Sequence, residues 1–391
     1  MNIIKITILL VYLTNIFTSF GQSFASITSI NSMTISSNTG EKPQSKVWSY
    51  DNKWWSVLSD GTGTYIWELK YINNEYVWVR SLHLSNSTKT YADCKLNSNS
   101  LHILLFDKNT SIPKASLISV YYDQNTNSYS FLNNNTNPLD LILNNSVETA
   151  TIDIDSQNRL WVAYEKDTKI YVRWTNFPYT TWSNELSIYS GVKNDDICSI
   201  IHLNDKIGVL WSNQNTKRFG FKVHENSNPP STWSLDEVPS SGSAQNIGYG
   251  MADDHLNLAV LNDGTLYCAI KTSYDTIGSP KIGLIVRDTN GSWSQLYNVS
   301  ESGTRPIVTL NETTNKLQVV YTSSESGGNI LYKESDIGQI MFGNSQILIS
   351  ADPQNSLNYN NVSSSKNNYS SEIVILASSG NRLASVIANS D

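Results

Sequence analysis

Polar side chains that could bind a ligand recur at the predicted start of the innermost strand in each repeat of the chain. Aromatic faces stack on the apolar face of a sugar ring, while carboxylates and amides accept hydroxyl protons, so their mixture suits a sugar or a peptide. Water at the centre of a ring of sheets also favours polar residues, so polarity by itself does not require a ligand. The predicted ligand-binding set is Gln44, Lys46, Tyr91, Asp93, Glu148, Asp196, Tyr249, Arg305, Tyr359 and Asn360.

Two of these residues are the candidates for catalysis. Glycoside hydrolysis needs two carboxylates at a suitable separation, and Asp93 and Glu148 fall in adjacent repeats. A shift of one residue in strand register would turn either side chain away from the centre. The chain has no Gly-x-Ser-x-Gly elbow and no glycine-rich phosphate loop. We therefore expect a binding protein rather than an enzyme.

Metal and cofactor sites are not predicted. The five histidines are scattered singly without the spacing of zinc ligands. Asp253-Asp254-His255, Asp195-Asp196 and Asp153-Ile154-Asp155 offer carboxylates that calcium could use, but no bidentate Glu follows at EF-hand distance. Hydrated turns are the simpler interpretation of all three acidic segments.

A four-stranded sheet is predicted at the start of the mature chain. Alternating residues indicate strands at Ser45 to Tyr50, Trp54 to Ser59 and Thr64 to Leu69, with a fourth from Glu75 to Leu82. Turn-forming pairs such as Asp51-Asn52 separate them. The unit is an antiparallel meander.

The second strand of this unit recurs along the chain. Matching apolar segments begin 47 to 59 residues apart, at Trp54, Leu101, Leu160, Ile207, Leu266, Leu317 and Ile373. This spacing is close to one propeller blade, so the sequence predicts an all-β, seven-bladed β-propeller of four-stranded antiparallel sheets. The last repeat is one strand short, and the alternating run from Ile27 to Ile35 is available to complete it and cover its edge.

The N-terminus predicts export. Lys5 precedes an apolar run from Ile6 to Phe17, and small residues follow, so residues 1–25 read as a signal peptide cleaved near Gly21-Gln22 or Ala25-Ser26. Residues 26–391 then form one propeller domain, secreted or held in the periplasm or at the cell surface. No later segment is apolar for long enough to span a membrane.

Charge and cysteine content narrow the partners. The net charge of −7, with no cluster of basic residues, argues against nucleic acid. The three cysteines are widely separated and are expected to be free and buried. We expect a monomer without cofactors.

The run Lys42-Pro43-Gln44-Ser45-Lys46-Val47-Trp48, followed by Trp54-Trp55-Ser56-Val57-Leu58, resembles the first blade of secreted bacterial β-propeller proteins of uncharacterised function. More distantly, the Trp-Ser outer strands at Trp182, Trp233 and Trp293 are similar to sialidase-like propellers. That resemblance implies three central arginines and a Tyr-Glu nucleophile. Only Arg305 lies at the start of an inner strand, so sialidase activity is not expected.

Three functions remain open. The leading expectation is a secreted binding module that recognises carbohydrate or a cell-surface protein at the central funnel. The enzymatic alternative is a polysaccharide-processing glycoside hydrolase or lyase. The third is a scaffold protein of an envelope complex.

Overall fold

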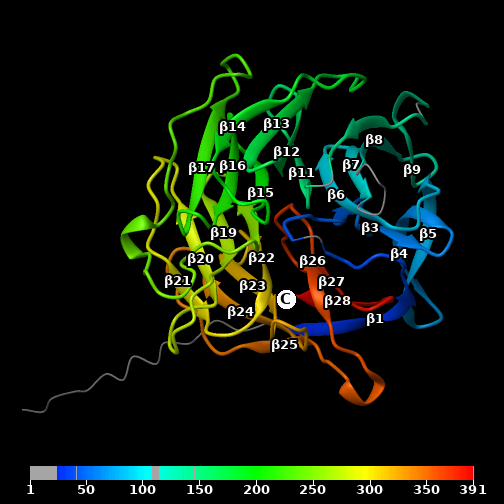
Figure 1. Ribbon diagram of the computed structural model, residues 1–391. Helices are drawn as coiled ribbons and strands as arrows, with labels where there is room; N and C mark the ends of the chain where they lie inside the picture. Colours follow the sequence, from blue (N-terminus) through cyan, green and yellow to red (C-terminus); the bar gives the residue numbers. More distant parts are fainter. Residues whose placement is uncertain (1–23, 41, 108–113, 135, 145, 391) are drawn as a thin grey trace, which may run out of the picture.

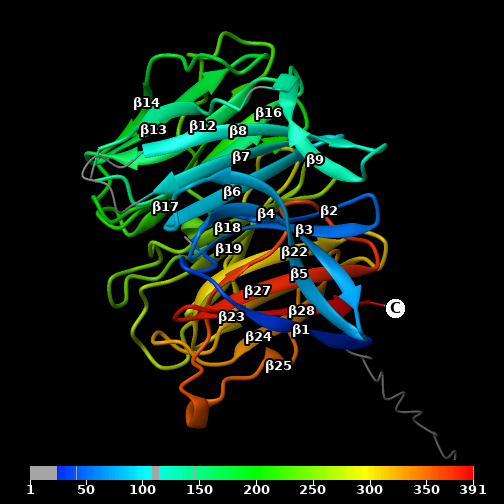
Figure 2. The same ribbon diagram turned by 90° about the vertical axis from the view of Figure 1, so that its right-hand side faces the viewer.

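The computed structural model describes residues 24–390 except 41, 108–113, 135 and 145, and it shows a ring of seven antiparallel sheets (Figure 1). The colours follow the ring in chain order, so each sheet, or blade, is built from one stretch of sequence (Figures 1 and 2). The described residues contain strands and three short 3₁₀ turns but no α-helix. The predicted seven-bladed propeller is confirmed.

The first three blades follow directly along the chain. The first contains β2 (Val47–Tyr50), β3 (Lys53–Asp60), β4 (Gly63–Ile72) and β5 (Glu75–Ser85). The second contains β6 (Thr90–Asn97), β7 (Ser100–Asp107), β8 (Lys114–Asp123), β9 (Ser128–Phe131) and β10 (Leu139–Ile142). The third contains β11 (Ala150–Ile154), β12 (Leu160–Lys166), β13 (Lys169–Thr175) and β14 (Leu186–Ser190).

The remaining blades complete the ring. The fourth contains β15 (Cys198–Leu203), β16 (Lys206–Asn213) and β17 (Arg218–Glu225). The fifth contains β18 (Leu256–Val260), β19 (Leu266–Lys271), β20 (Ile282–Arg287) and β21 (Tyr297–Ser300). The sixth contains β22 (Thr304–Asn311), β23 (Lys316–Thr322), β24 (Ile330–Asp336) and β25 (Gln346–Ile349). The seventh contains β26 (Asn360–Ser363), β27 (Glu372–Ser379), β28 (Arg382–Asn389) and β1 (Ser26–Thr34).

Every apolar segment that defined the sequence repeat is the second strand of a blade. These strands are buried on both faces because each lies between the first and third strands of its own sheet and packs against neighbouring blades. Val162 in β12 and Ile375 in β27, for example, are fully buried. This is why their near-continuous hydrophobicity marks the repeat so clearly.

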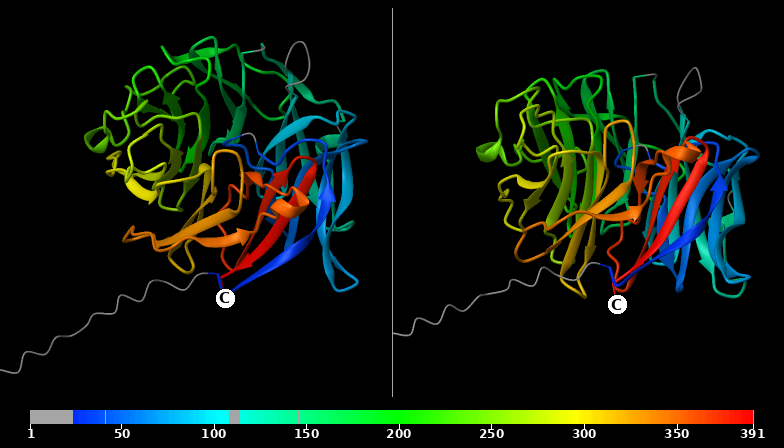
Figure 3. Two further views of the ribbon diagram at one scale, coloured as in Figure 1. Left: turned by 60° about the horizontal axis from the view of Figure 1, so that its bottom comes forward. Right: turned by 90° about the horizontal axis from the view of Figure 1, so that it is seen from below.

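The N-terminal strand closes the ring. β1 pairs antiparallel with β28, from Ser26 opposite Asn389 to Thr34 opposite Arg382. The blue and red ends of the chain therefore lie side by side in one sheet (Figure 3). Ile30 in β1 and Ile35 just after it are buried in the core shared with the first and seventh blades. The predicted closure is confirmed.

The fourth blade departs from the expected four strands. The sequence predicted an outer strand at Trp233, but β17 is the outermost regular strand of this blade. In place of a fourth strand, a single isolated bridge joins Phe221 of β17 to Glu237. Pro229 and Pro230 precede this segment and have no N–H group to donate to a ladder. One side of this sheet is therefore left more open.

Tryptophans of the Trp-Ser segments pack between blades. Trp182 lies in the core shared by the second and third blades, and Trp293 stacks edge-on against Phe221 of the fourth blade. Trp54 and Trp67 are buried between the seventh and first blades.

The described part of the chain contains no helix with the length and apolar character needed to cross a bilayer.

Candidate functional site

The seven innermost strands, β2, β6, β11, β15, β18, β22 and β26, surround a central channel that is too narrow to hold a ligand. The cavity inside it has a volume of about 30 Å³, which is room for about two water molecules. Its lining includes Gln44, Asp153 and Lys366, from three different blades. We call the face of the ring where these strands begin the channel mouth.

Asp93 is a structural tie within the channel. Its side chain is fully buried and accepts the Ser45 N–H at 2.8 Å and the Ile152 N–H at 2.7 Å, which joins the first three blades. Lys366 Nζ lies 2.5 Å from Asp93 Oδ2. Burial raises the pKa of Asp93 although Lys366 opposes that shift.

A second buried ion pair lies beside the first. Lys95 Nζ is 2.9 Å from Asp153 Oδ1, and Asp153 Oδ2 accepts the N–H of His202 at 3.0 Å. Burial alone would raise the pKa of Asp153, but Lys95 and Lys366 outweigh it and lower that pKa. The channel charges therefore connect blades through main-chain groups rather than face solvent.

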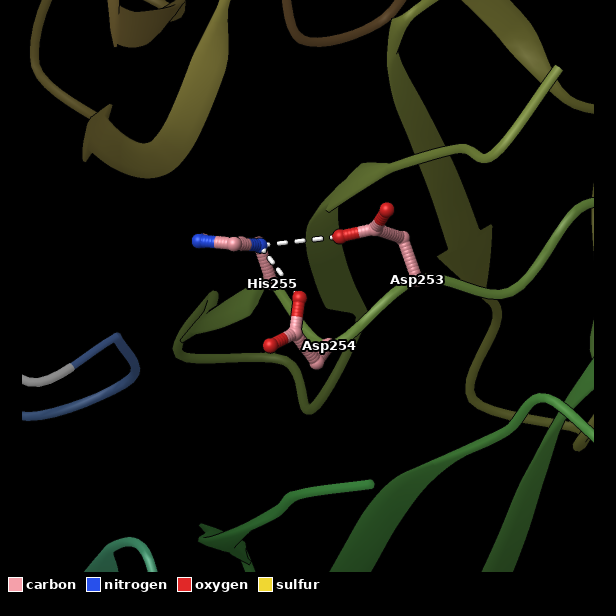
Figure 4. A group of neighbouring side chains, drawn as sticks. All are labelled: Asp253, Asp254 and His255. Carbon is pink, nitrogen blue, oxygen red and sulfur yellow. Dashed lines mark hydrogen bonds and ion pairs between the residues drawn. The ribbon is translucent and has the colours of Figure 1, made fainter. Parts of the chain in front are cut away.

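The channel mouth contains a histidine held by two carboxylates at the start of β18. His255 Nδ1 lies 2.8 Å from Asp253 Oδ1 and 2.7 Å from Asp254 Oδ1 (Figure 4). Burial would lower the pKa of His255, but the two carboxylates outweigh it and raise that pKa. Its Nε2 points away from both aspartates, is buried, and has no hydrogen-bond partner among the described residues (Figure 4). The segment is thus not the hydrated turn expected from the sequence.

Two lysines form ion pairs with this triplet. Lys42 Nζ contacts Asp254 and lies 2.9 Å from Glu148 Oε2, while Lys271 Nζ lies 3.3 Å from Asp253 Oδ2. Burial would lower the pKa of Lys42, but Asp254 and Glu148 outweigh it and raise that pKa.

Oxygens of Glu148, Asp195 and Asp254 are close enough together to hold a metal ion. However, the Lys42 ammonium already lies against two of these carboxylates. The chain itself thus supplies the positive charge that they need.

Tyr249 supplies an exposed aromatic ring beside this network. Its side chain is 79% exposed, and its N–H donates to the Ser273 carbonyl at 3.1 Å. Ser273 in turn donates from Oγ to Asp253 Oδ2 at 2.9 Å. Gly248 and Gly250 on either side have φ of 52° and 95°, so the loop holds the ring out with backbone conformations suited to glycine.

Two buried acids lie near the mouth at the end of β12 and before β15. Glu165 accepts the Thr168 N–H at 2.8 Å through Oε1, and its Oε2 is buried without a hydrogen-bond partner among the described residues. Burial, aided by the charge of Asp196, raises the pKa of Glu165 to about 8. Glu165 is therefore a protonated acid at neutral pH. This could not be predicted from the sequence, where Glu165 is one polar position at a strand end.

The ten predicted binding residues lie in different environments. Gln44, Lys46, Asp93, Asp196 and Tyr359 are buried, and Tyr91, Glu148, Arg305 and Asn360 are half-buried. Only Tyr249 is exposed.

The structure brings few of these ten residues into mutual contact. Lys46 lies over the Tyr91 ring at 5.8 Å, while Gln44 donates to the Ala150 carbonyl at 2.9 Å. The proposed catalytic pair is divided, because Asp93 is engaged inside the channel whereas Glu148 pairs with Lys42 at the mouth. Their ligand-binding role stays a prediction.

Sequence reasoning missed the lysines that neutralise these acids. Lys42 was quoted only as part of a family-like run, and Lys366 lies in a polar loop without any local pattern. The Asp253 to His255 triplet was considered as a calcium site because of its carboxylates. The burial of His255 was not predicted. A buried apolar strand directly after it was the available signal.

No family model and no curated protein matches the chain. Solved structures match its fold. A polysaccharide lyase described as an ulvan lyase aligns with a TM-score of 0.58 and 8% identity over 92% of this chain and 96% of its own. An arginine mutant of AofleA from Arthrobotrys oligospora aligns with a TM-score of 0.52 and 10% identity over 83% of this chain and 91% of its own. The endosialidase of phage phi92 aligns with a TM-score of 0.50 and 12% identity over 94% of this chain and 70% of its own. These likenesses show a common propeller fold.

Proposed function

We propose that the protein is a carbohydrate-binding propeller that holds its ligand at the channel mouth. The observation that carries the proposal is the exposed ring of Tyr249, anchored through Ser273 to the Asp253 to His255 network. An aromatic face binds the apolar side of a sugar ring, while neighbouring carboxylates, lysines and imidazole bind its hydroxyl groups. Such a ligand needs no room inside the narrow channel.

The charge of the mouth favours neutral glycans. In the network around His255, carboxylates outnumber cationic groups: Glu148, Asp195, Asp253, Asp254 and Glu325 face Lys42, Lys271 and His255. The cationic groups are already engaged in ion pairs, so a sugar acid would meet net negative charge. Neutral hydroxyl-rich ligands avoid that repulsion.

The fold supports the proposal only in general terms. Propellers of this shape include proteins named as a polysaccharide lyase and an endosialidase. The choice of site and of neutral ligands comes from the residues of this chain.

A glycan array of the mature chain tests this function. We expect binding to neutral oligosaccharides, with weaker signals for sialylated or uronate-containing glycans. A preference for acidic glycans would contradict the assigned site. No binding across the array would contradict the carbohydrate proposal and favour a protein partner at the cell surface or an envelope scaffold.

A hydrolase or lyase is the second candidate, and the geometry of His255 favours it. Nδ1 is fixed by two carboxylates while Nε2 has no hydrogen-bond partner among the described residues. This arrangement suits a general acid. Product analysis on any bound glycan separates the two functions: turnover lost in His255→Gln supports catalysis, and binding without turnover contradicts it.

We further propose that the chain is exported and that cleavage follows Gly21. The predicted signal lies outside the described residues except for Phe24 and Ala25. Phe24 is buried, and its ring centroid lies 4.9 Å from that of Tyr332. The Ala25 N–H donates to the Asn389 carbonyl at 2.7 Å. Cleavage after Ala25 would remove these contacts. Mass spectrometry of the secreted protein is expected to give Gln22 as its first residue, and Ser26 would contradict this.

A further inference from the structure

The open side of the fourth blade borders a cavity of about 120 Å³. The cavity lies between β14, the outermost strand of the third blade, and β16 and β17 of the fourth. Within β17, the described main chain on this side is paired only at Phe221, with Glu237, and at Val223, with Ser234. The missing outer strand therefore leaves the wall of the cavity uncovered near Phe219.

Two aromatic rings form much of this wall. The Tyr189 and Trp211 ring centroids are 4.7 Å apart with an interplanar angle of 33°. Trp211 lies over Gly220 in the next strand, where an added Cβ would come within 2.2 Å of the indole. Glycine at this position therefore makes the space that holds the indole at the edge of the cavity.

The indole N–H of Trp211 is an unused donor. The Trp211 side chain is buried, with 1% exposure, and its Nε1 has no hydrogen-bond partner among the described residues. Trp67 donates to the Leu58 carbonyl at 3.0 Å and Trp161 to Asp155 at 2.9 Å, whereas Trp182 Nε1, like that of Trp211, has no partner among the described residues. A buried donor without an acceptor destabilises the fold. A ligand oxygen in the cavity would remove that cost.

We infer that this cavity is a second carbohydrate site, which binds one pyranose ring of a neutral sugar. The half-buried Tyr189 ring offers an open aromatic surface to the apolar ring face, and Trp211 Nε1 can donate to a hydroxyl oxygen. Asp236 on the rim is half exposed and accepts hydroxyl protons, while Lys222 at 3.0 Å balances its charge. The cavity thus offers contacts both for the ring face of a sugar and for its hydroxyl groups.

The second site lies on the same side of the ring as the channel mouth but is built from separate residues. The turn between β16 and β17 is held to the loop before β15, since Gln214 N–H donates to Asp196 at 3.2 Å. Lys217 Nζ also donates to the Gly248 carbonyl at 3.3 Å, next to Tyr249. The inference does not depend on the mouth, so each site can fail alone.

The test is titration of the ¹⁵N-labelled full-length mature protein with a panel of neutral methyl pyranosides, followed by NMR of the tryptophan indoles. Trp211→Phe assigns the Trp211 resonance. We expect that resonance to shift saturably with Kd on the order of 1 mM, as befits a ligand of this size. The Trp67 indole, in the first blade, should not move. A Trp211 resonance that is unmoved by every sugar of the panel would overturn the inference and leave water as the occupant.

Variants locate the binding. Tyr189→Ala removes the stacking wall and is expected to weaken the titration at least tenfold, whereas Leu235→Ala, a 91% exposed neighbour outside the cavity, should not. Tyr249→Ala should leave this titration unchanged while it affects the mouth. If Tyr189→Ala does not fold, Asp236→Ala serves in its place with an expected loss of several fold. Equal binding by a folded Tyr189→Ala variant would also contradict the assignment.

Discussion

Buried charged residues in this protein act across blade boundaries. Asp93 accepts main-chain N–H groups from the first and third blades, and Lys366 from the end of the chain neutralises it. At the mouth, His255 and Lys42 likewise neutralise Asp254. Because such groups are fully engaged, polarity near a propeller axis is weak support for a catalytic role.

Asp93→Ala is expected to lower the free energy of unfolding by about 3–5 kcal/mol, because it leaves Lys366 buried without its partner. Chemical denaturation measures this change. The double variant Asp93→Ala with Lys366→Met should recover part of the loss, since no unpaired charge remains. A loss below about 1 kcal/mol in the single variant would show that the tie is not structural.

Glu165 gives the fold a pH dependence. Its pKa is about 8 when folded and 4.5 for an ordinary Glu. Between these values the unfolded chain releases the proton and the folded chain keeps it, so this contribution to stability is present below pH 4.5 and lost as pH rises through 8. Glu165→Gln cannot titrate and should be more stable than wild type at pH 8, by on the order of 2 kcal/mol. Thermal unfolding at pH 5 and pH 8 checks this. Parallel pH profiles for both proteins would contradict it.

At the residue scale the sequence predicted types of side chain but not their partners. Tyr249 was predicted to bind a ligand as an aromatic near an inner strand; the structure shows that its ring is exposed, and its binding role stays a prediction. Glu148 pairs with Lys42, more than a hundred positions away. Ion pairs between distant segments depend on the closed ring, and a local pattern holds no information about them.

At the scale of elements, hairpin turns carry much of the regularity. Asp155 accepts the N–H groups of Gln157 and Arg159, each at 2.9 Å, and the Trp161 indole at 2.9 Å. One buried carboxylate thus fixes the turn before β12 and orients the tryptophan that packs between blades. The sequence indicated a hydrated turn in this acidic segment, and the structure shows that it is the hairpin turn between β11 and β12.

Asp155→Ala should cost about 2–4 kcal/mol, because a buried indole N–H and two main-chain donors lose their acceptor. Asp263→Ala is the matched control: Asp263 is exposed in the equivalent turn of the fifth blade and accepts one main-chain N–H, from Thr265 at 2.8 Å. Its loss should stay near 1 kcal/mol. Urea denaturation of both variants measures the difference, and equal losses would contradict the role of Asp155.

The second strands could be predicted because burial on both faces makes them continuously apolar. Outer strands are short and partly exposed, so their pattern is weaker, as the missing fourth strand beside β17 shows. The cavity beside Trp211 results from the missing fourth strand, so it could not be predicted from the sequence.

At the scale of the whole molecule, one strand holds the ring closed. β1 supplies the edge of the seventh blade, and Phe24 and Ile30 bury side chains in the core between the last and first blades. The sequence predicted this closure by counting: seven second strands and one blade a strand short. Topology was therefore predictable, because it follows from repeated local patterns, whereas the chemistry of the mouth was not.

Deletion of residues 26 to 36 is expected to destabilise the entire ring, because it uncovers β28 along its length and opens the core. Calorimetry should show a lower and broader unfolding transition, with association through the open sheet edge. A chain that begins at Gln22 is the control and should unfold as a single transition. An unchanged transition after the deletion would contradict closure by β1.

The central claim, that the channel mouth binds a neutral glycan through Tyr249, is tested most directly by calorimetric titration of the best array ligand into three proteins. These are wild type, Tyr249→Ala and Tyr71→Ala, where Tyr71 is 61% exposed at the β4 to β5 turn on the opposite face. We expect Tyr249→Ala to weaken binding by about tenfold or more while Tyr71→Ala binds like wild type. Unchanged affinity in a folded Tyr249→Ala variant would contradict the claim.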